Sequence, residues 1–486
     1  MACVLIFVAF SLLWAAFVDA TTLAASTCET IEKRVSSASR VTYPGALSPI
    51  IASEATGHWF LSSNQVPACV FEAGSPGDIS IALRVIGRDR SPFAVMSGGH
   101  ASNQGFSSTK GVHISLRRLS QVALSPNNRT VEIGFGQKWV DVFRKLDGTG
   151  YNVVGGRVPG PGVGGFTLGG GYSWKTNQYG LTCDTVKSFN LVLPNGTITT
   201  ASERFNRDLF FALKGGMNKF GIVTSAVFST HQQPPKVYGG LIIYPSSSVP
   251  TLLNQTVAFS SGSTDKRTQI ITTIGGSPTG NTALALFFHD GPEKPSSFAP
   301  FEGIPHLLNT VKSQSFLKFV QSVPSELAQV ANVRGAFATM STSDITAKFA
   351  YAIKAECDRL GGLMALHSGV TVSYDIEPFT KYGEFATESA YPHRTSPLPL
   401  NLYFSWANKL EDDYWHSQMR ESIQRLKKVA IEDGIYGSDF TQYPNYALAP
   451  ATAEELYGIG NAARLRSIRR RIDPDRIMDL VGGFEI

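Results

Sequence analysis

The sequence predicts an α+β protein with two unlike halves. Between residues 98 and 221, short strand-like runs are separated by glycine turns, which is typical of a sheet with tight connections. Beyond residue 235 glycine becomes sparser, and longer strand-like runs alternate with segments of helical periodicity. With 486 residues, 43% of them hydrophobic, the chain is long enough for two or three domains. We place domain boundaries near residues 235 and 436.

Strands are expected where apolar and polar residues alternate, and helices where apolar residues recur every three or four positions. Asn195-Gly196 marks a two-residue hairpin turn in the first half. In the first half the expected strands are 93–96, 111–116, 130–135, 189–193, 197–200 and 222–228, and the expected helices are 138–146 and 208–213. In the second half the expected strands are 239–244, 269–274, 283–288, 363–374 and 399–406, and the expected helices are 249–260, 341–360 and 412–432.

The first 20 residues predict a signal peptide. Residues 2–18 contain no charged side chain, and Val18-Asp19-Ala20 supplies small or apolar residues at the positions before a cleavage site. We expect a secreted protein that is cleaved near Ala20. The alternative is an uncleaved anchor, because the apolar run reaches the ~17 residues that a span needs at least. No later stretch of the sequence is long and apolar enough to cross a membrane.

Secretion permits disulfides and N-linked glycans. Cys3 is removed with the signal peptide, and Cys28 and Cys69 near the start of the mature chain are the expected pair. Cys183 and Cys357 lie in apolar surroundings and are expected to be buried thiols. The glycosylation sequons are at Asn128, Asn195 and Asn254.

The net charge of +5 is too small to indicate nucleic-acid binding by itself. Six arginines between Arg464 and Arg476 either bind phosphate or form the solvated face of a helix. We expect the solvated face, and no nucleic-acid partner. We also expect no metal site, because the sequence around His113 lacks the spacing of metal ligands.

Two glycine-rich stretches carry the functional signal. Residues 160–165 satisfy G-x-G-x-x-G, but three more glycines at 169–171 cost a helix roughly 1 kcal/mol each, which excludes the long helix of a Rossmann motif. What remains is backbone that can approach a flat or anionic group closely, because no Cβ intervenes. The second stretch, residues 97–102, has the consecutive amides of an anion-binding nest suited to pyrophosphate, with His100 at its end. A lone histidine of this kind is more often structural.

These stretches belong to a larger pattern of motifs. The segments PFAVMSGGH (92–100), GVGGFTLGGG (162–171), YGLTCD (179–184) and GGMNKFGIVT (215–224) resemble the FAD-binding PCMH-type domain of the vanillyl-alcohol oxidase superfamily. The segments YPNY (443–446), YGIGNAARL (457–465) and DP (473–474) resemble its berberine-bridge-enzyme-like subfamily.

The resemblance implies an FAD-binding domain in two parts, residues 21–235 and 436–486, with a substrate-binding domain of residues 236–435 between them. That second domain would have an antiparallel sheet flanked by helices. FAD would be held covalently through His100, and Asn445 and Tyr446 would return to the flavin edge. The cofactor-binding residues implied are Ser97, Gly98, Gly99, His100, Ala101, Ser102, Gly164, Gly165, Gly169, Gly170, Asp184, Gly221, Ile222, Val223 and Asn445.

The chain departs from the family pattern at two positions beside the flavin. Many relatives attach the flavin a second time through a cysteine where this chain has Val158. Valine cannot form a thioether, so we expect no second cysteinyl link; Cys183 is the nearest other thiol in the sequence. Pro161 stands where relatives gate oxygen at the flavin, which leaves oxidase and dehydrogenase chemistry both open.

The catalytic base is the least specified residue. Plant relatives carry a glutamate where this chain has Asn401, and an asparagine cannot act as a base. Sugar-oxidising relatives use the tyrosine that corresponds to Tyr446. A tyrosine with a pKa near ~10 needs tuning by its neighbours to act at neutral pH. Tyr446 is therefore either the base or a packing residue at the flavin edge. Tyr403 is the second candidate base, with core packing as its alternative.

The resemblance implies an FAD-linked oxidoreductase. It would abstract hydride from a C–H bond next to oxygen or nitrogen of a small molecule, with O2 as the expected acceptor and a secondary metabolite as the expected substrate. The alternatives are a carbohydrate oxidase and a flavin-bearing cyclase without net redox chemistry.

Overall fold

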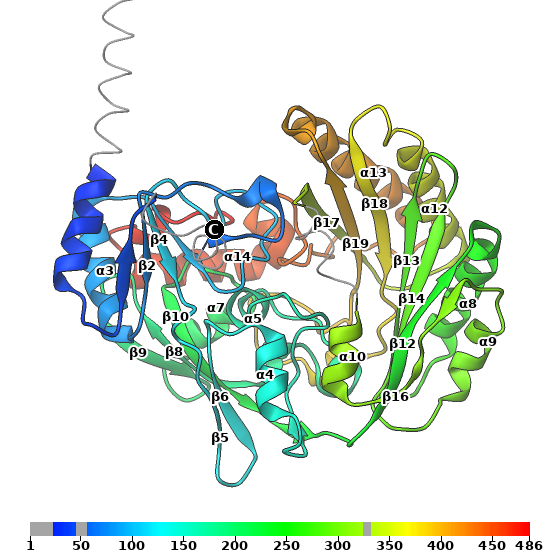
Figure 1. The fold of residues 1–486 in the computed structure, drawn as a ribbon, viewed down its shortest axis with the longest axis horizontal. Coiled ribbons are helices and arrows are strands. Elements are labelled where there is room, and N and C mark those ends of the chain that lie inside the picture. The colour runs from blue at the N-terminus through cyan, green and yellow to red at the C-terminus, as the bar shows by residue number, and fades with distance from the viewer. Residues whose placement is uncertain (1–22, 45–55, 324–331) are drawn as a thin grey trace, which may run out of the picture.

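The computed structural model describes residues 23–44, 56–323 and 332–486 (Figure 1). The predicted signal peptide and its cleavage site lie outside these residues. The structure confirms the α+β class, with three main sheets in two halves. Within the described ranges, no helix is long and apolar enough to cross a membrane.

The first half holds two larger sheets and a two-stranded sheet formed by β7 and β11. One has the order β1-β2-β4-β3, in which β2, β4 and β3 are parallel. The other is antiparallel, with the order β5-β6-β10-β8-β9. The elements are β1 (Arg40–Thr42), β2 (Cys69–Glu72), α3 (Pro76–Asp89), β3 (Phe93–Met96), β4 (Val112–Ser115), β5 (Val122–Leu124), β6 (Thr130–Gly134), α4 (Trp139–Leu146), β7 (Tyr151–Asn152), α5 (Val163–Leu168), α6 (Thr176–Tyr179), β8 (Val186–Val192), β9 (Ile198–Ser202), α7 (Arg207–Leu213), β10 (Ile222–Ser229) and β11 (His231–Gln232).

The second half is one large antiparallel sheet. Its order is β15-β12-β14-β13-β18-β19-β17, and β16 also pairs with β12. The elements are β12 (Val237–Tyr244), α8 (Val249–Gly262), β13 (Thr268–Gly276), β14 (Thr282–His289), α9 (Ala299–Glu302), β15 (Leu308–Asn309), β16 (Lys312–Gln314), α10 (Phe316–Ser322), β17 (Arg334–Thr342), α12 (Ala347–Gly361), β18 (Gly369–Ile376), β19 (Leu398–Trp406) and α13 (Asp412–Glu432); the chain then leaves this half and continues into α14 (Ala453–Ile472).

The two faces of the large sheet pack against different parts of the chain. One face is covered by α8, α12 and α13 (Figure 1), and its apolar side chains form a core cluster with these helices, for example the cross-strand row Ile274, Tyr374 and Leu402. Side chains alternate between faces along a strand, so the neighbouring residues point toward the first half of the chain. This second face is where Phe337 and Tyr403 lie against Phe60.

The C-terminal segment returns to the first half. Leu456, Leu465 and Ile468 of α14 are buried in the core cluster of the first two sheets, and Phe93 of β3 bridges Val481. Figure 1 shows α14 within the half that holds β2, β4 and β10. This arrangement supports a two-part first domain, while the boundaries near residues 235 and 436 stay a prediction.

Most predicted elements are confirmed, with two differences in the second half. Residues 341–342 were expected to begin a helix, but they end β17, a strand of small and apolar residues without the alternation that would reveal it. Residues 363–368 were expected in a strand, but they form turns after α12 because Gly361-Gly362 ends that helix. In the first half, α5 ends at Leu168, directly before the three glycines.

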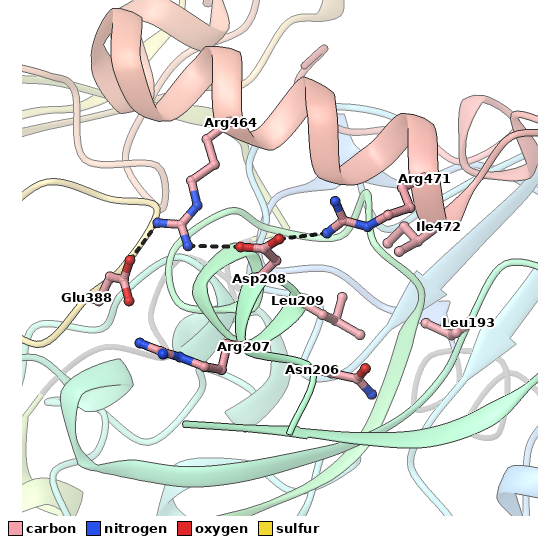
Figure 2. A pocket seen from close by; sticks show the side chains of 9 residues that line it. All are labelled: Leu193, Asn206, Arg207, Asp208, Leu209, Glu388, Arg464, Arg471 and Ile472. Carbon is pink, nitrogen blue, oxygen red and sulfur yellow. Dashed lines mark hydrogen bonds and ion pairs between the residues drawn. The ribbon is translucent and has the colours of Figure 1, made fainter. Parts of the chain in front are cut away.

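The arginine run lies largely on α14. Figure 2 shows Arg464 between Glu388 and Asp208, at 2.6 and 3.0 Å, and Arg471 at 2.7 Å from Asp208. The pocket drawn there is lined by both signs of charge. Because carboxylates already neutralise these guanidinium groups, the run has the character of an ion-paired helix face.

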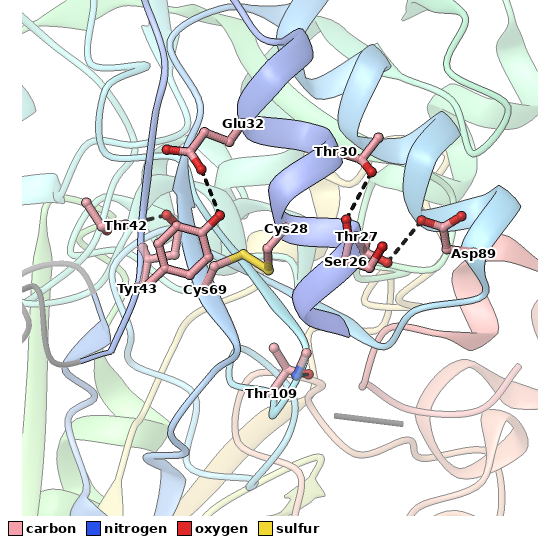
Figure 3. Close-up of a disulfide and its surroundings, with 12 residues drawn as sticks. Ser26, Thr27, Cys28, Thr30, Glu32, Thr42, Tyr43, Cys69, Asp89 and Thr109 are labelled. Carbon is pink, nitrogen blue, oxygen red and sulfur yellow. Dashed lines mark hydrogen bonds between the residues drawn. A yellow bond between two sulfur atoms is a disulfide. The ribbon is translucent and has the colours of Figure 1, made fainter. Parts of the chain in front are cut away.

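The expected disulfide is present. Cys28, in the helical segment at residues 23–34, is bonded to Cys69 at the start of β2 (Figure 3). Cys183 and Cys357 are buried thiols, as the sequence predicted.

Candidate active site

The two glycine-rich stretches lie against each other, backbone on backbone. A Cβ added to Gly98 would lie 2.3 Å from the amide nitrogen of Gly162, and one added to Gly162 would lie 2.2 Å from that of Gly98. No side chain fits in this contact. The Ser97 hydroxyl donates to the carbonyl of Phe135 at 2.5 Å and accepts from the amide of Gly164 at 3.1 Å. These bonds hold the 97–102 turn at the start of α5.

His100 stands at the end of this turn, beside two aromatic rings. Its ring stacks on Trp59 at 4.4 Å between centroids and is parallel to Phe337 at 6.0 Å. Its Nε2 is buried without a hydrogen-bond partner among the described residues. Burial, helped by the charge of Lys138, lowers the pKa of His100 to about 4. The imidazole is therefore neutral at physiological pH, with an uncommitted ring nitrogen.

The second glycine stretch leaves open space and meets the C-terminal segment. Within the described parts of the chain, and apart from its two chain neighbours and the backbone of its own helix, no atom lies within 4 Å of a Cβ added to Gly165. Four residues later, a Cβ on Gly169 would lie 2.1 Å from Oδ1 of Asn445. The Asn445 amide donates to the carbonyl of Phe166 at 3.0 Å, so the C-terminal segment contacts α5. Gly170 has a φ of +114°, which also requires glycine.

Three more residues of the 97–102 turn are hydrogen-bonded to their surroundings. The Ser63 hydroxyl lies 2.9 Å from the carbonyls of both Ala101 and Ser102. The Ser102 hydroxyl accepts from the amide of Phe337 at 3.2 Å, which joins the turn to β17 of the large sheet. Gly99 has a φ of +70° and its carbonyl accepts from the amide of Trp59.

The remaining predicted cofactor residues lie farther along the first half. Gly221 precedes β10 with a φ of +125°, and the side chains of Ile222 and Val223 are buried in the core, so a ligand would meet the backbone there. The Asp184 carboxylate is occupied internally, since it accepts from the amide of Leu181 and from Nε2 of His393. The roles of these four residues in cofactor binding stay predictions.

Tyr446 belongs to a buried ionic cluster that the sequence did not reveal. Arg157 and Glu377 form a bidentate pair at 2.7 and 2.9 Å. Arg157 also donates to the Tyr446 oxygen at 2.6 Å, and the Tyr446 hydroxyl donates to Glu377 at 3.2 Å. Burial raises the pKa of Tyr446 well above its usual value, although Arg157 opposes the shift. Burial raises the pKa of Glu377 as well, again against the effect of Arg157.

Both candidate tyrosines contact the ring of Phe337, which also faces His100. The Phe337 centroid lies 6.1 Å from that of Tyr446 and 5.5 Å from that of Tyr403. Burial raises the pKa of Tyr403 to about 12. In contrast to Tyr446, Tyr403 makes no hydrogen bond to a carboxylate within the described part of the chain, and it packs with Phe60. The structure thus brings His100, Tyr446 and Tyr403 around one aromatic side chain.

Replacing Arg157 by methionine is expected to lower the free energy of unfolding by about 3–5 kcal/mol, because Glu377 would be left buried without its counter-charge. Urea unfolding followed by circular dichroism measures this. The matched control is Arg144→Met, which removes an exposed ion pair with Asp141 on α4 and should cost less than about 1 kcal/mol. Equal losses in the two variants would contradict a buried, mutually dependent pair.

Comparison with known proteins agrees with this geometry. Residues 67–202 match the family model of an FAD binding domain. The chain is 30% identical over 452 residues to an FAD-dependent monooxygenase of Fusarium proliferatum, covering 86% of this chain and 85% of that protein. It is 37% identical over 268 residues to an uncharacterized FAD-linked oxidoreductase of Arthroderma benhamiae, covering 54% of this chain and 53% of the relative.

Solved structures share the fold. A variant of berberine bridge enzyme superposes with a TM-score of 0.76 at 16% identity, over 93% of this chain and 98% of that one. A glucooligosaccharide oxidase from Acremonium strictum, which carries a 6-S-cysteinyl, 8α-N1-histidyl FAD, superposes with a TM-score of 0.73 at 20% identity, over 91% of this chain and 96% of that one. The chain therefore belongs to the FAD-dependent oxidoreductases that carry this FAD binding domain, and it has the fold of berberine bridge enzyme.

Proposed function

We propose that this oxidoreductase removes hydride from a C–H bond next to oxygen or nitrogen of a small organic molecule, with O2 as the final acceptor and FAD tethered through His100. The observation that carries the proposal is the convergence on Phe337. The ring of a neutral histidine with an uncommitted nitrogen lies 6.0 Å from this ring, and that of a tyrosine bonded to a buried carboxylate lies 6.1 Å from it, centroid to centroid. The first suits a covalent tether and the second suits proton removal.

The described residues fit FAD at this place. The uncommitted Nε2 of His100 and the open space at Gly165 are both left unused by the protein itself within the described ranges. The residues that would hold the cofactor are Ser97, Gly98, Gly99, His100, Ala101, Ser102, Gly164, Gly165, Gly169, Gly170 and Asn445, with Gly221, Ile222 and Val223 on the adenine side. Bound there, FAD supplies the acceptor for the hydride.

The protein's own part is to remove the proton that leaves with the hydride. Its raised pKa prevents Tyr446 from resting as a phenolate. The hydroxyl of Tyr446 already points at Glu377, so the tyrosine can accept a proton from the substrate while it passes its own proton to that carboxylate. Arg157 bonds to both groups and stabilises the negative charge as it moves between them.

The residues near the proposed flavin site support a single tether. The structural neighbour from Acremonium strictum has a cysteinyl as well as a histidyl link. In this chain the expected cysteine position is Val158, and burial raises the pKa of the Cys183 thiol well above its usual value, which makes it a poor nucleophile. We further propose that the chain acts outside the cell, since a disulfide favours an oxidising compartment.

The test is anaerobic mixing of the purified flavoprotein with a panel of primary alcohols, secondary alcohols and amines. We expect at least one compound to bleach the flavin absorption, and readmitted air to restore it with one hydrogen peroxide per molecule of product. Product formation without bleaching would identify a cyclase, and bleaching that air does not reverse would identify a dehydrogenase. Because a relative is named a monooxygenase, the product is also analysed for labelled oxygen, whose incorporation would contradict simple oxidation.

A further inference from the structure

A row of polar side chains crosses the face of the large sheet that points toward the first half. The strand registers place Thr273 of β13 opposite Asp375 of β18, Asp375 opposite Asn401 of β19, and Asn401 opposite Thr339 of β17. We call these four residues the polar row. Burying such groups costs free energy unless they form hydrogen bonds with each other or with a ligand.

The polar row lies between the two parts of the candidate active site. In one direction along the strands, Tyr403 lies two residues from Asn401 and Phe337 lies two residues from Thr339. The Phe337 ring is parallel to the His100 ring. In the opposite direction, Glu377 lies two residues from Asp375 and accepts a hydrogen bond from the Tyr446 hydroxyl. Residues two apart on one face of a strand are separated by roughly 7 Å. A substrate between His100 and Tyr446 therefore lies within reach of the row.

Hydrogen bonds within the row leave acceptor positions of Asp375 and Asn401 free. The Asp375 carboxylate accepts from the Thr273 hydroxyl at 2.6 Å and from the Asn401 amide at 2.8 Å. A carboxylate has about four acceptor positions, so two remain. The side chain of Asn401 is 5% exposed, and its Oδ1 has no partner in the described part of the chain. A group that completes these bonds must donate hydrogen bonds.

We propose that Asp375 and Asn401 are specificity-determining residues, which bind a hydroxyl or amino group of the substrate other than the group that is oxidised. This inference rests on the proposed function for the position of the substrate. It narrows the substrate class to compounds with at least two O–H or N–H groups. The neighbouring Phe337 and Tyr403 rings favour a flat, aromatic body beside that second group.

The experiment uses two probes that differ in one hydrogen-bond donor: salicyl alcohol and its phenolic methyl ether. Both carry the same benzylic C–H and hydroxyl, but only the first has a second O–H group. Calorimetric titration of the flavoprotein is expected to give at least about 10-fold tighter binding of salicyl alcohol, because a buried acceptor left unpaired rejects the analogue. The preference is expected to fall to near one in Asp375→Asn and in Asn401→Leu.

The matched control is Thr339→Val, in the same row, because the Thr339 hydroxyl donates to the carbonyl of Leu400 at 2.8 Å. It should keep the preference. Equal binding of the two probes to the unaltered protein, no binding of either, or a preference that survives in Asp375→Asn would overturn the inference. Anaerobic flavin reduction by the same two alcohols tests the proposed function separately. A binding preference without reduction would keep the subsite and remove the oxidase.

Discussion

His100→Ala is expected to lose all covalently bound flavin. When the unaltered protein is precipitated with acid, the pellet should stay yellow, whereas the pellet of His100→Ala should be colourless and its supernatant should fluoresce. The physical reason is that the buried ring of His100 is neutral and keeps one nitrogen free of hydrogen bonds among the described residues. A neutral imidazole nitrogen is the form that can bond to carbon.

The matched control for this experiment is His231→Ala. His231 also has a buried Nε2 without a partner in the described ranges, and burial likewise lowers its pKa to about 4. It stacks on Tyr179 and lies on β11, apart from the glycine turns. His231→Ala should keep its yellow pellet. A yellow pellet from His100→Ala would move the tether to another side chain, and flavin released by the unaltered protein would mean a non-covalent site.

Tyr446→Phe is expected to slow flavin reduction by about 100- to 10,000-fold, the usual contribution of a positioned acid or base. The rate constant is measured by anaerobic stopped flow with the best substrate of the panel. The flavin content and its spectrum should not change, because the phenylalanine keeps the ring contact with Phe337. The loss follows from the hydroxyl alone, which connects the substrate to Glu377.

Tyr403→Phe tests whether Tyr446 or Tyr403 is the catalytic base. If Tyr446 is the base, removing the Tyr403 hydroxyl should change the rate by less than about 10-fold. If the large loss appears in Tyr403→Phe instead, the second candidate is the base and Tyr446 only packs at the flavin edge. A small effect in both variants would exclude a tyrosine base, and Asp375 or Glu377 would then be the groups to replace.

Local sequence signals predicted the framework of the site well. The turn at residues 97–102 and the glycines at 160–171 depend on backbone angles or contacts that only glycine tolerates, so they are visible in the sequence itself. The hairpin at Asn195-Gly196 and the strands with regular alternation are also specified by residues close together in the sequence. The β17 strand was missed because both of its faces are buried, which removes the alternation.

The charged part of the site was not visible in the same way. Nothing in the sequence near Arg157 indicates its partner Glu377, which is 220 residues away. In the sequence, Asn401 indicates only that the glutamate of plant relatives is missing, because its hydrogen-bond partner Asp375 lies on another strand. Sheet register decides such pairs, and register depends on the packing of whole strands rather than on local composition.

The sequence by itself therefore determined the fold class, the disulfide, the glycine turns and the histidine at their end, because each of these is specified by residues close together in the chain or by a recurring set of motifs. Only the tertiary structure brought Tyr446 to Glu377, aligned Asp375 with Asn401 and placed Phe337 near both His100 and Tyr446. The Asp375–Asn401 pair depends on the register of two strands in the large sheet, and the contacts of Tyr446 and His100 with that sheet join it to the C-terminal segment and to the glycine turn.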